Sequence, residues 1–254
     1  MTLSLDLPSC PPSCVGRLDP RWKLAALLGA AVACTLLQTP AAALLALAGA
    51  LLLALVARLP LAWFAPRLGT ALLMLALFVA WLPFLPRPGD ATVELAGVAI
   101  SLPGLRLALV LLARAAALVT LMLVLLATAP LHDTLKAAHA LYVPGVLVQI
   151  AALTYRYVFL LAEEFGRLRV ALRVRGFRNR ADRRSYQTIG QVAGTLLVRS
   201  HERAERVAQA MRCRGFDGRF RSLHAFRTAP ADVLGFLVIL GAAGGLLAWD
   251  WVGR

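Results

Sequence analysis

Long apolar runs broken by short polar segments fill the first half of this 254-residue chain. Runs of this kind are typical of membrane-spanning helices, because about 20 apolar residues cross the hydrocarbon core of a bilayer. The pattern predicts about five spans, over residues 24–39, 41–57, 69–85, 105–127 and 233–251. The first two are short, and Gln38-Thr39-Pro40 between them favours a two-span hairpin with a tight turn; a re-entrant or tilted pair is the alternative.

The pattern becomes amphipathic between residues 128 and 231. A short helix is expected first, followed by two long ones over 146–175 and 185–214; in the second, apolar residues recur at spacings of three and four. Residues 144–162 are apolar enough to resemble a sixth span. Arg156 near their middle would cost roughly 2.5–3.5 kcal/mol on an insertion scale, so a helix lying against the membrane is preferred.

Charge follows the same division. The net charge is +14, and 18 of the 27 Lys and Arg residues lie within 128–231. Because Lys and Arg resist translocation, the N-terminus and this basic segment are expected on the cytoplasmic side of the cell inner (plasma) membrane. The expected domains are a flexible tail at 1–16, a membrane domain of about four spans at 17–127, the basic segment at 128–231 and a last transmembrane helix at 232–254.

Two decapeptides in the basic segment, 171–180 and 210–219, share Ala, Arg, Arg, Gly, Phe and Arg at the same six places. Each ends an amphipathic stretch, where arginine suits the negative end of the helix dipole and glycine can close the helix. One such end is an ordinary helix cap, but a cap alone does not explain two matching ends. The residues expected to bind a partner are Arg173, Arg175 and Gly176 in the first repeat and Arg212, Arg214 and Gly215 in the second.

The expected target of these arginines is an acidic groove on a partner protein, since guanidinium groups bind carboxylates with two parallel hydrogen bonds. Membrane lipid is a second expected partner. Nucleic acid is not, because the basic segment is tethered among membrane spans and its arginines lie at helix ends rather than along a stripe.

Other chemistry is not indicated. The chain has no Gly-x-x-x-x-Gly-Lys-Ser/Thr loop for ATP, and its spans have no paired carboxylates or nucleophile–base pattern. An intramembrane enzyme built on Arg114, His132, Asp133 and His139 is the disfavoured alternative. No metal site or other cofactor is expected, because the two histidines lie two turns apart and only Asp133 is near them. Arg114, inside a predicted span, indicates either a structural buried charge or a contact to a partner.

Several motifs together resemble the transmembrane (T) component of energy-coupling factor (ECF) transporters, a class of ABC transporter. They are Asp19-Pro20-Arg21-x-Lys23-Leu24, the run from Arg203 to Arg219, and the two Arg-Gly helix ends. The resemblance covers about residues 17–250 and is closest to the cobalt/nickel branch. It implies an all-α fold with about five transmembrane helices and, at 128–231, a cytoplasmic coupling domain of long crossing amphipathic helices.

The resemblance also implies a function. The chain would be the coupling subunit of an importer for cobalt or nickel ions, with no enzymatic activity or metal of its own; a vitamin (biotin-like) importer is the alternative. Arg175 and Arg214 would dock into grooves on two ABC ATPase subunits, and the helices would pass the motion to a substrate-capture membrane subunit. Arg114 is a candidate contact to that subunit. The family triplet is usually Ala-Arg-Gly, so Val174 and Cys213 depart from it.

Overall fold

The computed structural model describes residues 16, 18–82, 92–95, 98–178, 180–216 and 229–253. The predicted tail at 1–16 therefore lies outside the described residues, apart from Gly16. The chain divides into two compact units. The membrane unit comprises the described residues of 16–142 and 229–253, and the helical hairpin comprises those of 143–216.

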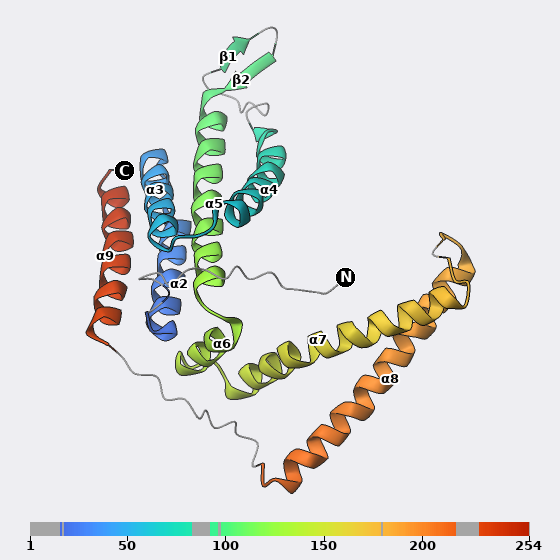
Figure 1. Ribbon diagram of the computed structural model, residues 1–254. Coiled ribbons are helices and arrows are strands. Elements are labelled where there is room, and N and C mark those ends of the chain that lie inside the picture. The colour runs from blue at the N-terminus through green and yellow to red at the C-terminus, as the bar shows by residue number, and fades with distance from the viewer. Residues whose placement is uncertain are drawn as a thin grey trace. The chain divides into compact units, whose positions relative to one another are not determined.

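The described part of the membrane unit contains a bundle of helices and one small β-hairpin (Figure 1). Its helices are α2 (Pro20–Leu36), α3 (Pro40–Val56), α4 (Leu61–Val79), α5 (Leu102–Thr128), α6 (Leu131–Ala140) and α9 (Pro230–Val252). Strands β1 (Thr92–Leu95) and β2 (Val98–Ser101) pair antiparallel immediately before α5. Proline is the first residue of α2, α3 and α9, a position where its missing N–H loses no helical bond and its fixed φ suits the helix.

Helix length and composition fit a membrane protein. Helices α4, α5 and α9 are long and apolar enough to cross a membrane, and α3 is a shorter apolar helix. At 1.5 Å per residue, the 17 residues of α2 rise about 26 Å, close to the roughly 30 Å of a hydrocarbon core. The predicted all-α polytopic class is confirmed. The β1–β2 hairpin is a local departure from it within the predicted loop at 86–104.

Small residues form many of the contacts between these helices, beside buried leucines such as Leu27 and Leu121. Other large aliphatic side chains point outward: Leu55 is 72% exposed and Leu77 is 77% exposed. Lipid tails are as apolar as leucine, so helices in a bilayer gain most by close packing through small residues. Six alanines are at most 1% exposed: Ala26, Ala42, Ala43, Ala57, Ala117 and Ala137.

Helices α2 and α9 run parallel and in close contact. The rings of Trp22 and Phe236 meet edge to face at 5.1 Å, and a Cβ on Gly29 would come within 2.7 Å of Leu240 Cδ2. Helix α3 packs mainly along α5. The predicted tight turn between α2 and α3 is present at 37–39, but the two helices pack on α9 and α5 rather than on each other.

Helix α4 begins at Leu61, eight residues before the predicted span at 69–85. The segment at 58–67, with Pro60 and Pro66, reads from the sequence as a turn between spans, yet α4 includes Pro66, which lacks the N–H that would donate within the helix. The helix is started by Pro60, whose carbonyl accepts hydrogen bonds from Trp63 N at 2.9 Å and Phe64 N at 3.0 Å. Arg67 then stacks on the Trp63 ring, 4.1 Å from its centroid.

The helical hairpin consists of α7 (Gly145–Val174) and α8 (Arg183–Cys213). Both helices agree with the predicted stretches at 146–175 and 185–214 to within two residues. They run in opposite directions from a short connection and diverge toward their other ends (Figure 1). By length and composition α7 also qualifies as a membrane span, and none of its residues is buried.

Candidate functional site

The first Arg-Gly repeat closes α7 through a backbone motif. Gly176 has a φ of +78°, the left-handed conformation, directly after Arg175. Gly176 N donates to Arg173 O at 3.1 Å, and Phe177 N donates to Leu172 O at 3.0 Å. This pair of bonds is the Schellman motif, which satisfies carbonyl groups that have no partner within the helix.

The second repeat closes α8 in the same way. Gly215 has a φ of +76° after Arg214. Gly215 N donates to Arg212 O at 3.0 Å, and Phe216 N donates to Met211 O at 3.0 Å. The shared sequence therefore corresponds to a shared three-dimensional structure at two helix ends.

The side chains at these ends divide into two sets. The phenylalanine of each repeat and the apolar residue five positions before it are half-buried: Leu172 with Phe177, and Met211 with Phe216. A hydrophobic contact between these two positions commonly accompanies the Schellman motif. The four arginines of the two ends are exposed: Arg173, Arg175, Arg212 and Arg214.

The exposed arginines are not used to cap their own helices. The Schellman bonds and the bonds from Arg175 N to Ala171 O and from Arg214 N to Ala210 O already occupy the last carbonyls. Within the described part of the chain, the guanidinium groups of Arg175 and Arg214 have no hydrogen-bond or ion-pair partner. They are available to a binding partner.

The two Arg-Gly ends lie at opposite ends of α8. Arg175 is beside the α7–α8 connection, and Arg214 follows the last residue of α8. At 1.5 Å per residue the 31 residues of α8 separate them by about 46 Å along the helix axis. The hairpin therefore presents two separate contact points rather than one continuous basic patch.

Ion pairs hold the two helices together where they cross. Glu164 of α7 accepts a hydrogen bond from Arg199 at 3.1 Å and pairs with Arg203 at 3.5 Å, both from α8.

The short connection between α7 and α8 is organised by two residues that the sequence did not single out. Asp182 caps the start of α8 by accepting from Arg183 N, and Ser185 Oγ accepts from Arg180 N at 3.3 Å.

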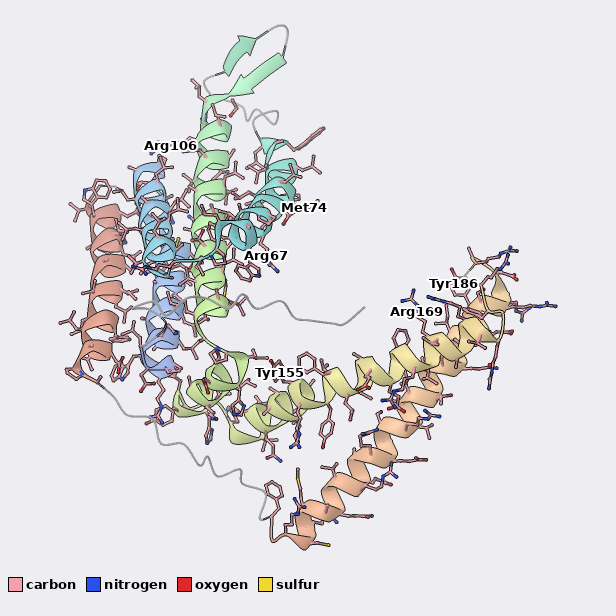
Figure 2. All side chains as sticks on the ribbon, in the orientation of Figure 1. Arg67, Met74, Arg106, Tyr155, Arg169 and Tyr186 are labelled. Carbon is pink, nitrogen blue, oxygen red and sulfur yellow. The ribbon has the colours of Figure 1, made fainter. Side chains whose placement is uncertain are left out.

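The hairpin surface is both basic and apolar. Nitrogen-tipped side chains project from the outer part of α7 and along α8, including the labelled Arg169 (Figure 2). Large apolar side chains are exposed on the same helices: Val146, Leu147, Ile150, Phe159, Ile189 and Leu197. Part of the apolar face of α8, including Ile189 and Leu197, is therefore exposed and is available to a partner or to lipid.

Arg114 lies in the middle of α5 and binds a helix end. Its Nη2 donates to the backbone carbonyl of Leu37, directly after the last residue of α2. A cation suits this position because the C-terminal end of a helix carries partial negative charge and unpaired carbonyls. The structure thus gives this predicted candidate a partner within the chain.

Asp250 is a buried charge that the sequence reasoning missed. It lies near the end of α9, is 2% exposed, and accepts hydrogen bonds from Gln38 N at 3.2 Å and Thr39 N at 2.9 Å. The Thr39 hydroxyl donates to it as well. These groups precede α3, whose N-terminal end attracts an anion. The available signal was an acidic residue inside an apolar run, which marks a functional or paired charge by default.

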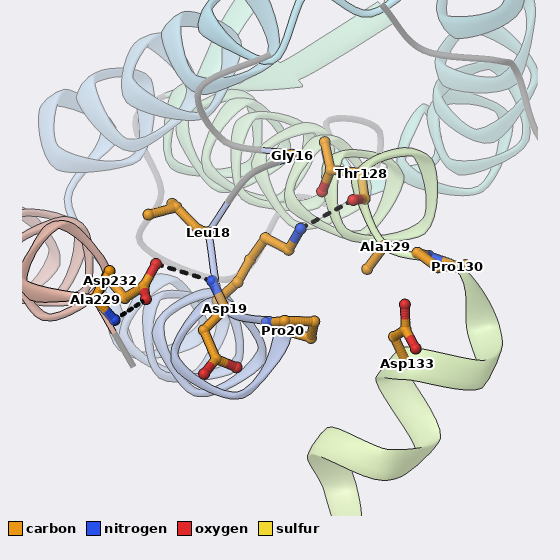
Figure 3. Close-up of a pocket in the computed structure, with 11 residues that line it drawn as sticks. Gly16, Leu18, Asp19, Pro20, Thr128, Ala129, Pro130, Asp133, Ala229 and Asp232 are labelled. Carbon is orange, nitrogen blue, oxygen red and sulfur yellow. Dashed lines mark hydrogen bonds between the residues drawn. The ribbon is translucent and has the colours of Figure 1, made fainter. Parts of the chain in front are cut away.

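The Asp19-Pro20-Arg21-x-Lys23 motif begins α2 and contacts two other helices. Asp19 caps α2 by accepting from Arg21 N at 3.1 Å. Asp19 N donates to Asp232 Oδ1 of α9 at 2.9 Å, and Lys23 Nζ donates to Thr128 O, at the end of α5, at 2.9 Å (Figure 3). Asp232 was also missed by the sequence reasoning.

The residues considered for an enzyme or a metal do not converge. Among the described residues no group of three or more His, Cys, Asp or Glu side chains is placed to hold a metal ion. His132, Asp133 and His139 lie along α6, and Asp133 pairs with Lys136 of the same helix at 3.8 Å. Arg114 is on α5 and bonds to the α2–α3 turn.

The fold and these helix ends define a multi-pass membrane protein with a basic helical hairpin. Comparison with known proteins identifies the family. The model for the family CbiQ, cobalt transport protein, matches residues 12–224. The chain therefore belongs to the CbiQ cobalt transport protein family, whose members are membrane components of transporters.

Curated relatives agree. Over 148 residues the chain is 36% identical to the cobalt transport protein CbiQ of Rhodobacter capsulatus, covering 58% of this chain and 60% of the relative. Over 137 residues it is 31% identical to an uncharacterized protein of Methanocaldococcus jannaschii, MJ1089, covering 54% of this chain and 50% of the relative. The chain thus spans about half to 60% of the length of these relatives.

Proposed function

We propose that this chain is the transmembrane coupling subunit of an ECF-type ABC importer for cobalt or nickel ions. It transmits the ATP-driven motion of ATPase subunits to a membrane subunit that captures the ion. Family membership supports a role in cobalt transport. The chain contains no phosphate-binding loop, which agrees with ATP hydrolysis on partner subunits.

The observation that carries this proposal is the pair of matching Arg-Gly ends. Each places an exposed arginine beyond a helix whose carbonyls are already satisfied. Two equivalent points about 46 Å apart suit a partner with two equivalent grooves, such as a pair of ATPase subunits. The guanidinium group favours a carboxylate in the groove, because its planar fork forms two parallel hydrogen bonds with it.

The ion pairs of Glu164 with Arg199 and Arg203 support transmission of motion through the hairpin. They join α7 to α8, so a displacement at Arg214 is carried to the crossing point with α7. The exposed apolar faces of both helices provide the surface for the capture subunit and for membrane lipid. In this proposal the cobalt or nickel ion is held by the capture subunit, and Arg114 has a structural role in the α2–α3 turn.

Charge supports a cytoplasmic hairpin and a cytoplasmic N-terminus in the plasma membrane. The basic segment at 128–231 holds 18 of the 27 Lys and Arg residues, which resist translocation. ATP is also on this side, so docking arginines must face it.

The test is a charge reversal at both ends. Arg175→Glu with Arg214→Glu places like charges against each carboxylate, and breaking one buried arginine–carboxylate pair weakens binding by about 2 kcal/mol or more, roughly 30-fold per site. We expect the double variant to lose copurification with the ATPase subunits and to lose cobalt ion uptake in cells.

Arg169→Glu with Arg206→Glu is the matched control, because both arginines are exposed, lie on the same two helices and are outside the caps. This control should retain the ATPase. If the cap variant binds and transports at the wild-type level, or if the control loses the ATPase equally, docking by the two ends is wrong.

A further inference from the structure

The N-terminal motif, the end of α5 and the start of α9 meet within the membrane unit. The chain leaves the membrane unit through the end of α5 and through α6, and its described part resumes at Ala229, just before α9. Within the membrane unit, the start of α2, the end of α5 and the start of α9 line one pocket of about 350 Å³ (Figure 3).

Lys23 ties the outgoing connection to α2. The residue is 2% exposed, and its Nζ donates to the carbonyl of Thr128, the last residue of α5, at 2.9 Å. Helix α6 follows directly and packs against α2. A buried ammonium group is retained only where it is compensated, so this bond fixes the end of α5 relative to α2.

Asp232 ties the returning connection to the same helix. The carboxylate is 5% exposed and accepts from Ala229 N at 2.7 Å and from Asp19 N at 2.9 Å. It therefore caps the start of α9 and holds the start of α2 at the same time. The edge-to-face contact of Trp22 with Phe236, one turn further on, continues this attachment.

We infer that Lys23 and Asp232 form a transmission joint. They are positioning residues that couple movement of the hairpin to α2, α5 and α9 together. This inference rests on the proposed function, because a joint has a role only if the hairpin is driven by ATPase subunits.

The physical reason is the placement of both charges. The hairpin is joined covalently to the membrane unit after α6 and before α9. On the membrane-unit side of these two connections, Lys23 holds the carbonyl of Thr128 and Asp232 holds the amide of Ala229. With both hydrogen bonds intact, α2 moves together with the end of α5 and the start of α9. With a bond removed, the end of α5 or the start of α9 shifts locally, and ATP hydrolysis proceeds without moving the bundle.

Lys23→Met tests the joint, since methionine keeps an unbranched apolar stem and removes the donor. Wild type and variant are reconstituted in liposomes with their ATPase and capture subunits, and the ratio of cobalt ions transported to ATP hydrolysed is measured. We expect this ratio to fall at least tenfold while the ATPase stays bound and hydrolyses at half the wild-type rate or more. Lys23→Arg, which retains a donor, should restore at least half of the ratio.

Lys136→Met is the matched control, because this lysine lies on α6 and, among the described residues, its ion pair is with Asp133 of the same helix. Its ratio should stay within twofold of wild type. A role in folding alone would lower transport and hydrolysis by the same factor, and that outcome, or an unchanged ratio in Lys23→Met, overturns the joint.

Asp232→Asn is a second test if the Lys23→Met protein does not accumulate in the membrane, since asparagine keeps the side-chain size and one acceptor oxygen. The same fall in ratio is expected. If neither variant accumulates in the membrane, the contacts serve folding and the joint is rejected. If the wild-type chain does not copurify with an ATPase, the proposed function is wrong as well. If the wild-type chain couples transport to ATP hydrolysis and Lys23→Met has the same ratio of cobalt ions transported to ATP hydrolysed, only the joint is wrong.

Discussion

Replacing the two cap glycines by alanine is a direct test of the helix ends. Gly176 and Gly215 have φ values of +78° and +76°, where a side chain costs roughly 1–2 kcal/mol. A Cβ on either would meet no atom within 4 Å, so the whole cost arises from the backbone. Each substitution should therefore lower the population of its capped end about 5- to 30-fold. The two effects should add, because the ends lie far apart.

Two other glycines provide controls with the opposite sign. Gly166 in α7 and Gly190 in α8 are inside helices, and a Cβ on either would also meet no atom within 4 Å. Alanine there should stabilise its helix by about 0.5–1 kcal/mol, because it removes the conformational freedom of glycine from the unfolded chain. The same chemical change thus has opposite predicted effects at cap and interior positions.

Amide hydrogen exchange measures both effects. The reporters are the amides of Phe177 and Phe216, which donate to Leu172 O and Met211 O at 3.0 Å. Exchange at these amides should be 5- to 30-fold faster in the cap variants and unchanged or slower in the interior controls. Loss of ATPase copurification should follow the cap variants only. The Schellman geometry would be refuted by exchange that changes in the same direction at cap and interior positions.

Two further predictions concern the charges that bind the α2–α3 turn, the buried Asp250 and the half-buried Arg114. Asp250→Ala leaves the Gln38 and Thr39 amides without their acceptor, at a cost of about 1–3 kcal/mol each. Thermal unfolding in detergent should therefore occur at a clearly lower temperature than in the control Val252→Ala, whose side chain is exposed. Equal unfolding temperatures of the two variants would contradict the cap. Arg114→Met should destabilise the isolated chain by about 1–3 kcal/mol through the stranded Leu37 carbonyl, and an effect seen only in the complete transporter would instead assign Arg114 to a partner contact.

Hydropathy located most of the helices because apolar runs and their breaks are local properties. Its errors have local causes too. The start of α4 was placed late because Pro60 and Pro66 are typical of a turn, although the helix accommodates Pro66 in its interior. The β1–β2 hairpin lies in a segment without long apolar runs. Helices α2 and α3 pack mainly on different neighbours, α9 and α5. This choice of neighbours depends on residues that are distant in the sequence, so no local pattern predicts it.

In the candidate site, too, local features were predictable from the sequence and long-range contacts were not. The Arg-Gly ends were predictable, because a helix cap is encoded within six adjacent residues. The partners of Arg114, Lys23 and Asp232 were not, since each bond joins residues more than 100 positions apart or links a side chain to a backbone group of another helix. A lone charge in an apolar run indicates that a partner exists, but its identity requires the fold.

The C-terminal ends of the two hairpin helices are closed differently from the helix ends of the membrane unit, and this difference bears on function. In the membrane unit the buried charges Asp19, Lys23, Asp232 and Asp250 all bind backbone groups at or beside a helix end. Lipid offers no hydrogen bonds to such groups, so the chain supplies them itself. In the hairpin, glycine closes both helices through the backbone alone. Side-chain charge is therefore not needed to close these two C-terminal ends, and the arginines beside the glycines remain available to a partner. If arginine served only to complement the helix dipole, it would be expected to bind the last carbonyls, as Arg114 binds Leu37.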